Sequence, residues 1–296
     1  MLPRNRIVSA ILLGVGLALL VWGIVTPRLT SIGENIPVAN SELTYTLTDE
    51  DATSLALTEE EPKVGPVERQ LHVQYTSPIT NEEVTARVGI STRRTGAATD
   101  LEGLLTAEVY SYRLNRMTGM PVTEATVSEQ LASPVAHIDL GGLWFAFPPY
   151  ADEEEYPVYD ATLRESRPAI KTGTEMEDGR EYVTYEQHIA EAGDADELGR
   201  VLYHEAQREF TVDHATGVVV NVAERVADYY EGERQDVLLF DASLDPSTTE
   251  HLKDMASSIA DPQAWTWANR VAAGVGGILA VVGIAGVLGA FGRRKR

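Results

Sequence analysis

One proline-interrupted segment, 144–159, concentrates the side chains with which this chain could hold a ligand. Prolines remove backbone donors and so prevent regular strand pairing in this segment. Aromatic rings line pockets for lipid tails and pack against sugar faces, so we predict a groove for a lipid or a glycan here. The alternative is a crossover segment that only fills the core between two β halves. The candidate ligand-binding residues are Trp144, Phe145, Phe147, Tyr150, Tyr156 and Tyr159.

The sequence carries no strong catalytic motif. It has no Gly-x-Ser-x-Gly elbow, no phosphate-binding loop and no His-Glu-x-x-His pair. It has no cysteine, which excludes thiol catalysis and cysteine-ligated metals. We therefore predict no catalytic residues, no metal site and no cofactor, and expect that the protein is not an enzyme. A hydrolase or transferase using carboxylates from distant strands stays open, because sequence spacing does not show which side chains meet in space.

Histidines and acidic runs are the remaining candidates for metal or acid–base chemistry. The six histidines are scattered, and no pair within one element has metal-ligand spacing. His204 and Glu205 are adjacent on a predicted strand, so their side chains point to opposite faces and form no dyad. The acidic runs 152–155 and 194–197 lack the alternating ligands and the glycine of a dedicated calcium loop. Solvated acidic loops are the favoured interpretation.

Two apolar stretches, 7–25 and 271–291, predict how the rest of the chain is anchored. Each contains no charged residue and is about 20 residues long, which is the length an α-helix needs to cross about 30 Å of hydrocarbon. We predict two transmembrane helices. The alternative for the first is a cleaved signal peptide, but its apolar region is longer than the usual length of about 7–15 residues. The sequence Pro-Val-Ala at 37–39 is a weak cleavage site.

Charge and aromatic residues around these stretches predict their orientation. Arg4 and Arg6 precede the first, and the basic run 293–296 follows the second. By the positive-inside rule, the tails 1–6 and 292–296 are cytoplasmic, the protein is in the plasma membrane, and the intervening segment is extracytoplasmic. Trp22, Trp265 and Trp267 lie at the opposite ends of the two stretches and are predicted at the membrane interface.

The segment between the two stretches is strongly acidic. It contains all 45 acidic residues and 18 of the 24 basic residues, which gives a net charge of −27. Such a surface repels nucleic acid, so we expect no nucleic-acid partner. Because there is no cysteine, about 240 residues must be stabilised by an ordinary hydrophobic core.

Alternation of apolar and polar residues predicts antiparallel strands through most of 27–244. After them, Asp245 and Pro246 are typical of a helix start, so 245–270 is predicted as a juxtamembrane helical segment. The predicted fold class is a membrane-anchored, mainly antiparallel β (α+β) ectodomain between N- and C-terminal transmembrane helices. Predicted strands lie at 43–47, 71–75, 84–90, 107–114, 181–189, 200–212, 218–228 and 236–241.

Small residues recur four positions apart within the two stretches, a spacing that lets helix backbones approach closely. Gly14 and Ala18 are the candidates in the first stretch, and Gly277 and Gly289 are those in the second. We predict that these residues pack the two spans on each other or on a multi-span membrane protein partner.

The sequence resembles the PorA family of actinobacterial membrane proteins over nearly its whole length. The resemblance rests on the two terminal spans, the turn 115–119 (Asn-Arg-Met-Thr-Gly), the segment 144–148 and the segment 156–163 (Tyr-Pro-Val-Tyr-Asp-Ala-Thr-Leu). Asn115 stands where the family pattern has Asp, and either residue permits the same turn. The resemblance implies a role in the cell envelope, in maturation of lipomannan and lipoarabinomannan. A hairpin of two spans does not itself enclose a pore, so the porin label does not describe its physical form.

Two hypotheses follow. The first is a non-enzymatic cell-envelope assembly factor that binds a membrane lipid or lipid-linked glycan, or docks on an envelope glycosyltransferase or transporter during lipoglycan maturation. The second is a structural accessory subunit that holds a multi-span membrane complex through its spans.

Overall fold

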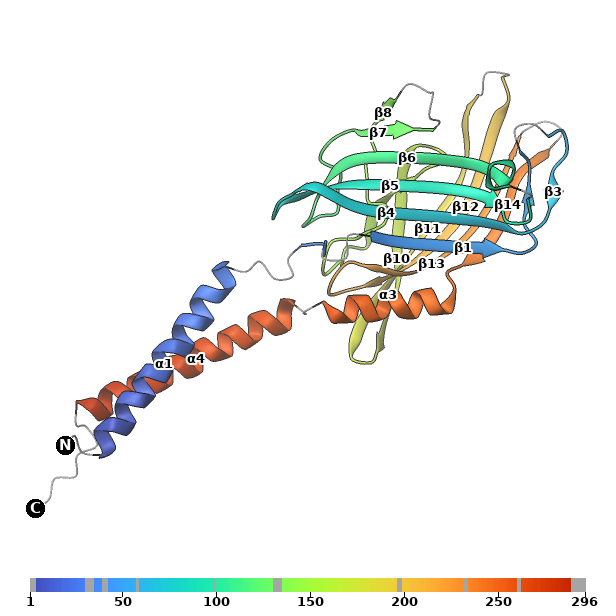
Figure 1. Cartoon of the computed structure of the whole chain (residues 1–296). Coiled ribbons are helices and arrows are strands. Elements are labelled where there is room, and N and C mark those ends of the chain that lie inside the picture. Colours follow the sequence, from blue (N-terminus) through green and yellow to red (C-terminus); the bar gives the residue numbers. More distant parts are fainter. Residues whose placement is uncertain are drawn as a thin grey trace, which may run out of the picture. The chain divides into compact units, whose positions relative to one another are not determined.

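The computed structural model describes residues 4–29, 35–38, 42–56, 59–97, 99–129, 135–195, 199–230, 234–259 and 262–288. The chain divides into a helical unit, 1–34 with 260–296, and a β-rich unit, 35–259. Figure 1 shows the helices and the two sheets. This arrangement confirms the predicted fold class, mainly antiparallel β between N- and C-terminal apolar helices.

The helical unit consists of α1 (Arg4–Leu29) and α4 (Pro262–Val287), which pack on each other. Within them, Ile7–Thr26 and Trp265–Val287 are long and apolar enough to cross a membrane, with hydropathies of 2.5 and 1.9. The predicted start of the second span at 271 lies inside the continuous helix α4, which begins at Pro262.

Glycines at a different spacing from the predicted one bring α1 and α4 together. A Cβ added to Gly16 would lie 2.4 Å from the Ala280 nitrogen, and one added to Gly276 would lie 2.5 Å from the Leu20 nitrogen. Gly23 and Gly283 make equally close approaches to the opposite helix. On each helix these glycines are seven residues apart, the spacing that keeps a contact line on one side of a left-handed helix pair.

The predicted row therefore lies outside this contact. A Cβ on Gly14 would have nothing within 4 Å, Ala18 is exposed, and a Cβ on Gly277 would touch only the Leu20 side chain at 3.8 Å. Gly289 lies outside the described residues. Each helix carries more than one row of small residues, and spacing alone does not show which row faces the other helix. Packing of the predicted row on a partner protein stays a prediction.

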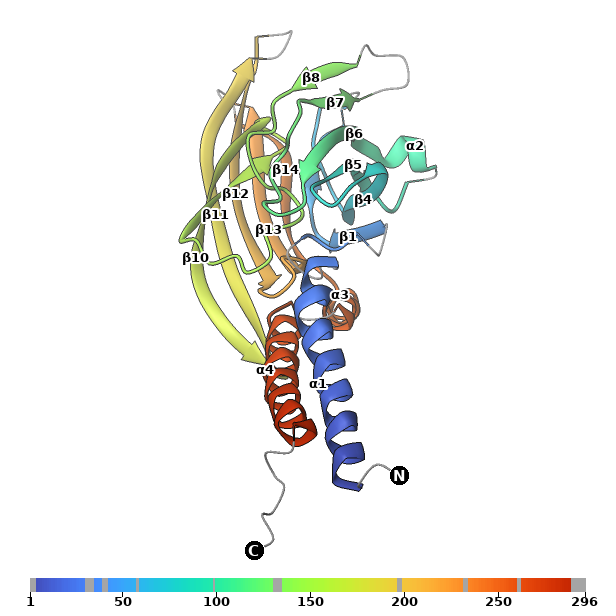
Figure 2. The same ribbon diagram turned by 90° about the vertical axis from the view of Figure 1, so that its left-hand side faces the viewer.

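The β-rich unit contains two antiparallel sheets that face each other (Figure 2). Helix α2 (Asp100–Gly103) lies between β5 and β6 in the chain, and helix α3 (Pro246–Ser258) follows β14. The six-stranded sheet has the order β1 (Glu42–Asp49), β4 (Val67–Ile79), β5 (Glu83–Arg94), β6 (Leu104–Asn115), β7 (Ala125–Ser128) and β8 (Ala136–Ile138). The eight-stranded sheet has the order β3 (Lys63–Val64), β2 (Thr53–Ser54), β14 (Gln235–Ser243), β13 (Val219–Tyr230), β12 (Val201–Asp213), β11 (Arg180–Ala195), β10 (Glu165–Glu177) and β9 (Glu155–Asp160).

Every predicted strand falls on an observed one, in β1, β4, β5, β6, β11, β12, β13 and β14. The sequence did not predict β9 and β10. Pro157 of β9 pairs with Pro168 of β10, and most of β10 is exposed. Such strands lack the alternation that burial of one face imposes, and prolines are tolerated at a sheet edge.

Local turn chemistry sets the ends of several strands. The Asn115 side chain accepts hydrogen bonds from the Met117 and Thr118 nitrogens, at 2.9 and 3.1 Å, and Gly119 has φ 72°. In the turn between β12 and β13, Asp213 Oδ2 accepts from the Thr216 nitrogen at 3.1 Å. In both turns an Asn or Asp side chain accepts from backbone nitrogens two or three residues later, which is the form of an Asx turn. Asp245 likewise caps α3 by accepting from the Ser247 nitrogen at 2.8 Å.

Candidate ligand-binding cavity

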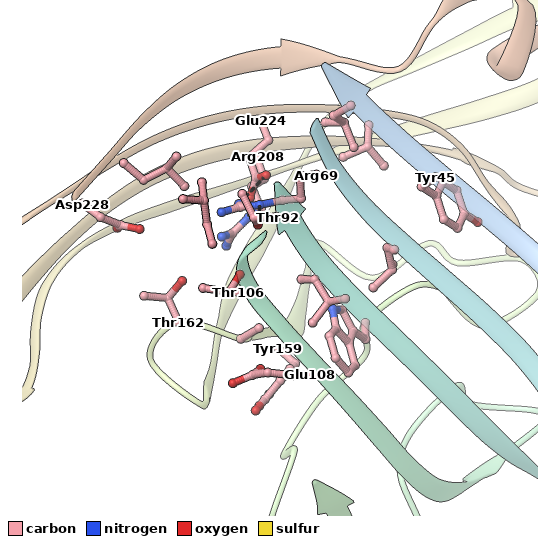
Figure 3. A pocket seen from close by; sticks show the side chains of 18 of the residues that line it. Tyr45, Arg69, Thr92, Thr106, Glu108, Tyr159, Thr162, Arg208, Glu224 and Asp228 are labelled. Carbon is pink, nitrogen blue, oxygen red and sulfur yellow. Dashed lines mark hydrogen bonds and ion pairs between the residues drawn. The ribbon is translucent and has the colours of Figure 1, made fainter. Parts of the chain in front are cut away.

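A cavity of about 350 Å³, which we call the first cavity, lies between the two sheets (Figure 3). This volume is within the range of small-molecule pockets, roughly 300–1,000 Å³. Its apolar walls come from alternate, inward-facing residues of both sheets, because successive side chains of a strand point to opposite faces. The apolar lining includes Leu47, Leu71, Ile90 and Leu105 from the six-stranded sheet and Phe210, Val222 and Leu238 from the eight-stranded one.

Three of the predicted aromatic residues line this first cavity: Trp144, Phe145 and Tyr159. They belong to the crossover between β8 and β10, which passes from one sheet to the other. The Trp144 ring meets the Tyr159 ring edge-on, with 5.0 Å between centroids, and meets the Tyr110 ring in the same manner at 4.8 Å. This packing holds the indole against the cavity.

The other three aromatic candidates lie elsewhere. Phe147 is fully buried and stacks on Tyr185 with 4.9 Å between centroids, and Tyr156 packs edge-on against both of these rings. Tyr150 has φ 59° and meets the His214 ring edge-on at 5.5 Å. The structure thus brings together only half of the predicted set. For Phe147 the core-filling alternative describes the observed position.

The Tyr159 hydroxyl is buried in the cavity wall, where it interacts with the Tyr110 hydroxyl. The residue is 2% exposed, and burial raises its pKa to about 12. The neighbouring Tyr110 hydroxyl donates to Glu108 Oε2 at 2.5 Å. A ligand oxygen that bound the Tyr159 hydroxyl would have to replace its interaction with Tyr110, because leaving a buried donor unsatisfied is unfavourable.

One wall of the cavity carries a chain of ion pairs that crosses between the sheets. Arg69 of β4 donates from Nη1 to Glu224 Oε2 of β13 at 2.7 Å, and Arg208 of β12 donates from Nε to Glu224 Oε1 at 2.6 Å. Arg208 Nη1 also donates to Asp160 Oδ2 at 2.5 Å. Figure 3 shows Arg69, Arg208 and Glu224 grouped together. The two arginines hold the pKa of Glu224 at about 2, despite its burial.

His204 completes this chain, which we call the ionic network: Arg69, Glu224, Arg208, Asp160, His204 and Asp228. The His204 ring is fully buried, with Nδ1 2.5 Å from Asp228 Oδ1 and Nε2 3.2 Å from Asp160 Oδ2. Burial disfavours the protonated ring, but the two carboxylates outweigh burial and raise the pKa of His204 to about 9. With His204 protonated, three cations balance three carboxylates.

A further ion pair joins the β9–β10 turn to the six-stranded sheet. Arg164, at φ 55°, donates to Glu108 Oε1 at 2.9 Å and also pairs with Glu129. Arg164 and Glu108 both line the first cavity. The charged groups of the wall are thus already engaged with one another.

Sequence reasoning missed the ionic network, although the sequence contains a signal for it. Arg69 lies in the same alternating phase as Val73 and Tyr75, and His204 and Arg208 lie in the same phase as Phe210. Charged residues on the apolar phase of a strand point into the sandwich and need partners there. The prediction for His204 was correct in one respect: Glu205, its neighbour, is exposed on the opposite face.

The acidic runs show no arrangement for a cation in the described residues. No group of three or more His, Asp or Glu side chains there is placed to hold a metal ion. Asp152 accepts from Lys171 Nζ at 2.6 Å, which lowers the pKa of Asp152. The second run, 194–197, lies partly outside the described residues.

Tryptophans predicted at the membrane interface lie near the ends of the candidate spans. Trp22 and Trp267 are 57% and 68% exposed, so their rings are free to contact lipid. Trp265 has a buried Nε1 without a partner in the described residues. Placement at the interface stays a prediction.

Comparison with known proteins identifies the family. The model of the family described as porin PorA matches residues 8–285. The chain belongs to the PorA family. With its two apolar terminal helices, this membership indicates a membrane protein of the cell envelope. No curated protein matches the chain.

Two solved structures show only faint similarity to this PorA-family chain. The GphF dehydratase, in a variant made for crystallization, is 12% identical, with 77% of this chain and 81% of that chain covered and a TM-score of 0.15. An isomerase-inactive variant of GphF DH1 is 13% identical, with 78% and 81% covered and a TM-score of 0.12. Neither score carries an argument about fold or function.

Proposed function

We propose that this PorA-family protein is a non-enzymatic cell-envelope assembly factor that binds a lipid or lipid-linked glycan in the first cavity, with the β-rich unit extracytoplasmic. The observation that carries the proposal is a cavity of about 350 Å³ between the two sheets, lined largely by aliphatic and aromatic side chains. Lipoglycan maturation, which the family resemblance implied, and docking on an envelope glycosyltransferase or transporter belong to this proposal.

The cavity has the chemistry of an amphiphile site. Its walls are largely aliphatic and aromatic, which suits an alkyl chain. Hydroxyls of Thr106 and Thr162 offer hydrogen bonds to a polar head group. In Figure 3 these two residues lie away from Tyr45.

The carboxylates of the wall favour binding over hydrolysis. Glu224 accepts from Arg69 and Arg208, and Glu108 accepts from Arg164. Asp228 pairs with the protonated His204. A general acid or base needs a pKa near the working pH, whereas Glu224 is held at about 2.

The test is to fill the cavity and ask whether lipid is lost. Val222 lines the cavity from β13, and Val222→Trp places an indole in it. The matched control is Val64→Trp, at a position that is 73% exposed on the short strand β3. Full-length proteins are extracted gently and weighed by native mass spectrometry, and the bound lipid is identified by extraction.

We expect wild type and Val64→Trp to carry a defined lipid or glycolipid at a stoichiometric ratio, and Val222→Trp to carry little. A Val222→Trp protein that melts like wild type and retains the same lipid at the same ratio would contradict the proposal.

A second candidate function, the structural accessory subunit, is favoured by one observation. Ala10, Gly14 and Ala18 form an exposed row on α1, outside its contact with α4 in the described helices. Such rows suit close packing of a further transmembrane helix. Gly14→Leu with Ala18→Leu should abolish copurification of a multi-span partner, whereas Ala18→Ser should preserve it. Unchanged copurification in the double variant would remove this candidate.

A further inference from the structure

A second cavity of about 240 Å³ lies in the β-rich unit. Its lining is almost entirely apolar, with the Ser258 and Tyr75 hydroxyls as the polar side-chain groups. Apolar cavities stay dry, and empty space in a core lowers stability, so this cavity suits an apolar occupant. The lining consists of Ile36, Pro37, Leu43, Tyr75, Ala146, Val218, Met255, Ser258 and Ile259.

The two cavities are neighbours along the interior of the sandwich. On β1, Leu43 lines the second cavity and Tyr45, two residues later, lines the first. Residues two apart on a strand share a face and are separated by about 7 Å. The adjacent pair Phe145 and Ala146 is divided between the cavities in the same way. The cavities are thus separated by little more than one layer of side chains.

That layer, which we call the partition, consists of Tyr45 and Phe145, with Tyr75 behind Phe145. Tyr45 and Phe145 are 2% and 4% exposed, and the Tyr75 and Phe145 rings have centroids 6.1 Å apart. The Tyr45 hydroxyl donates to the Val219 carbonyl at 3.2 Å, a long hydrogen bond. Tyr45 and Phe145 are therefore the side chains that must turn aside if the two spaces are to join.

The joined space has the Thr106 and Thr162 hydroxyls in its first part, Arg69, Arg208 and Glu224 in its wall, and the apolar second cavity at its other end. Thr106, Thr162 and Asp228 line the first cavity on the side away from Tyr45 (Figure 3), and the second cavity lies beyond Tyr45. Along β13 the first cavity extends from Val219 to Asp228, which is about 30 Å of strand. This length exceeds the roughly 15 Å that one leaflet contributes to the hydrocarbon core of a bilayer.

We propose that the two cavities are one site for a long-chain amphiphile. The head group binds at Thr106, Thr162 and Asp228, and the alkyl tail passes the partition and ends in the second cavity beside Met255 and Ile259. The proposal rests on the proposed function, since the first cavity must hold the amphiphile.

The experiment maps the end of the tail in the full-length protein in nanodiscs. The probes are octyl and triacontyl glucosides with a diazirine at the end of the alkyl chain, and peptide mass spectrometry locates the cross-links. We expect the octyl probe to label the first cavity, at residues such as Trp144, and the triacontyl probe, whose chain is longer than the first cavity, to label Met255 and Ile259. Triacontyl labelling confined to the first cavity overturns the joined site and leaves the proposed function standing. Labelling of neither cavity overturns both.

A variant that fills only the second cavity sharpens the result. Ala146 lines that cavity, and Ala146→Leu adds a branched side chain there. The matched control is Ala190→Leu, at an exposed position on β11. Triacontyl labelling of Met255 should fall at least about fourfold, the factor for one excluded methylene group, while octyl labelling is unchanged. If Ala146→Leu does not fold, Met255→Trp fills the same cavity from α3. Labelling of Ile259 is then measured in place of labelling of Met255. Unchanged triacontyl labelling of the second cavity in a folded variant overturns the joined site.

Discussion

His204 lies between two carboxylates in an interior that would otherwise keep an imidazole neutral. Asp160 of β9 and Asp228 of β13 contact its two nitrogens, and Arg208 on its own strand shares Asp160. The pKa of His204 is raised to about 9, so the ring is charged in the folded protein near neutral pH. The same ring in an unfolded chain has a pKa of about 6.5.

The raised pKa of His204 predicts how stability depends on pH. Its contribution is fully present below pH about 6.5 and is lost as the pH rises through about 9, because the folded protein holds the proton more tightly than the unfolded chain. The loss is on the order of 3 kcal/mol. Chemical denaturation of wild type and His204→Gln between these pH values measures it. If the variant loses as much stability as wild type over this range, another group is responsible.

Replacing the charged Glu224 side chain with an uncharged one of similar shape should strongly lower the free energy of unfolding. In Glu224→Gln, the buried Arg69 and Arg208 lose their shared carboxylate, and unfolding free energy should fall by about 3–5 kcal/mol. The matched control is Asp241→Asn, which breaks a pair with Arg225 in which both side chains are more than 60% exposed. That change should alter stability by less than about 1 kcal/mol. Equal effects of both substitutions in denaturant titrations would contradict a stabilising role of the network.

Two turns of the eight-stranded sheet contain a glycine with positive φ, and they should differ in how well they tolerate a side chain at that glycine. Gly217 in the β12–β13 turn has φ 73°, and a Cβ there would lie 2.0 Å from the Phe147 carbonyl oxygen. Gly179 in the β10–β11 turn has φ 79°, but a Cβ there would meet nothing within 4 Å. The two glycines share a conformation and differ in their surroundings.

Alanine at these two glycines separates backbone strain from steric clash. Gly179→Ala should lower stability by about 1–2 kcal/mol through the left-handed conformation alone. Gly217→Ala should lower it by several kcal/mol more, because the turn must move away from the crossover segment. Thermal melts of both variants against wild type make the comparison. Equal shifts would show that the crossover yields freely at Phe147.

The same elements show what sequence predicts and why it stops. Leu43–Leu47 and Val84–Ile90 were predicted because one buried face imposes alternation on the strand. The cavity was not predictable, because Arg69 and Glu224, 155 residues apart, meet only after the two sheets pack. The aromatic segment identified three cavity residues, but its proline spacing could not separate Trp144 from the core residue Phe147.

A ligand bound in the first cavity should stabilise the folded protein. A ligand that binds only the folded protein raises the free energy of unfolding, by about 2.7 kcal/mol at a hundred times its dissociation constant. Removing the bound lipid by detergent washing should therefore lower the melting temperature by roughly 5–10 °C. Val222→Trp, in which an indole occupies the first cavity, should show no such shift. A wild-type protein that melts at the same temperature with and without lipid would contradict this link.

The seven-residue spacing of Gly16 with Gly23, and of Gly276 with Gly283, has a consequence for how the spans can evolve. One inserted residue between two such glycines turns the second by about 100° and moves it about 1.5 Å along the axis. Its place in the contact would then pass to a neighbour with a side chain. Outward-facing positions should tolerate exchange of one apolar residue for another, but selection should remove insertions and deletions between the paired glycines. Related chains should therefore differ in the composition of their spans far more than in this interval.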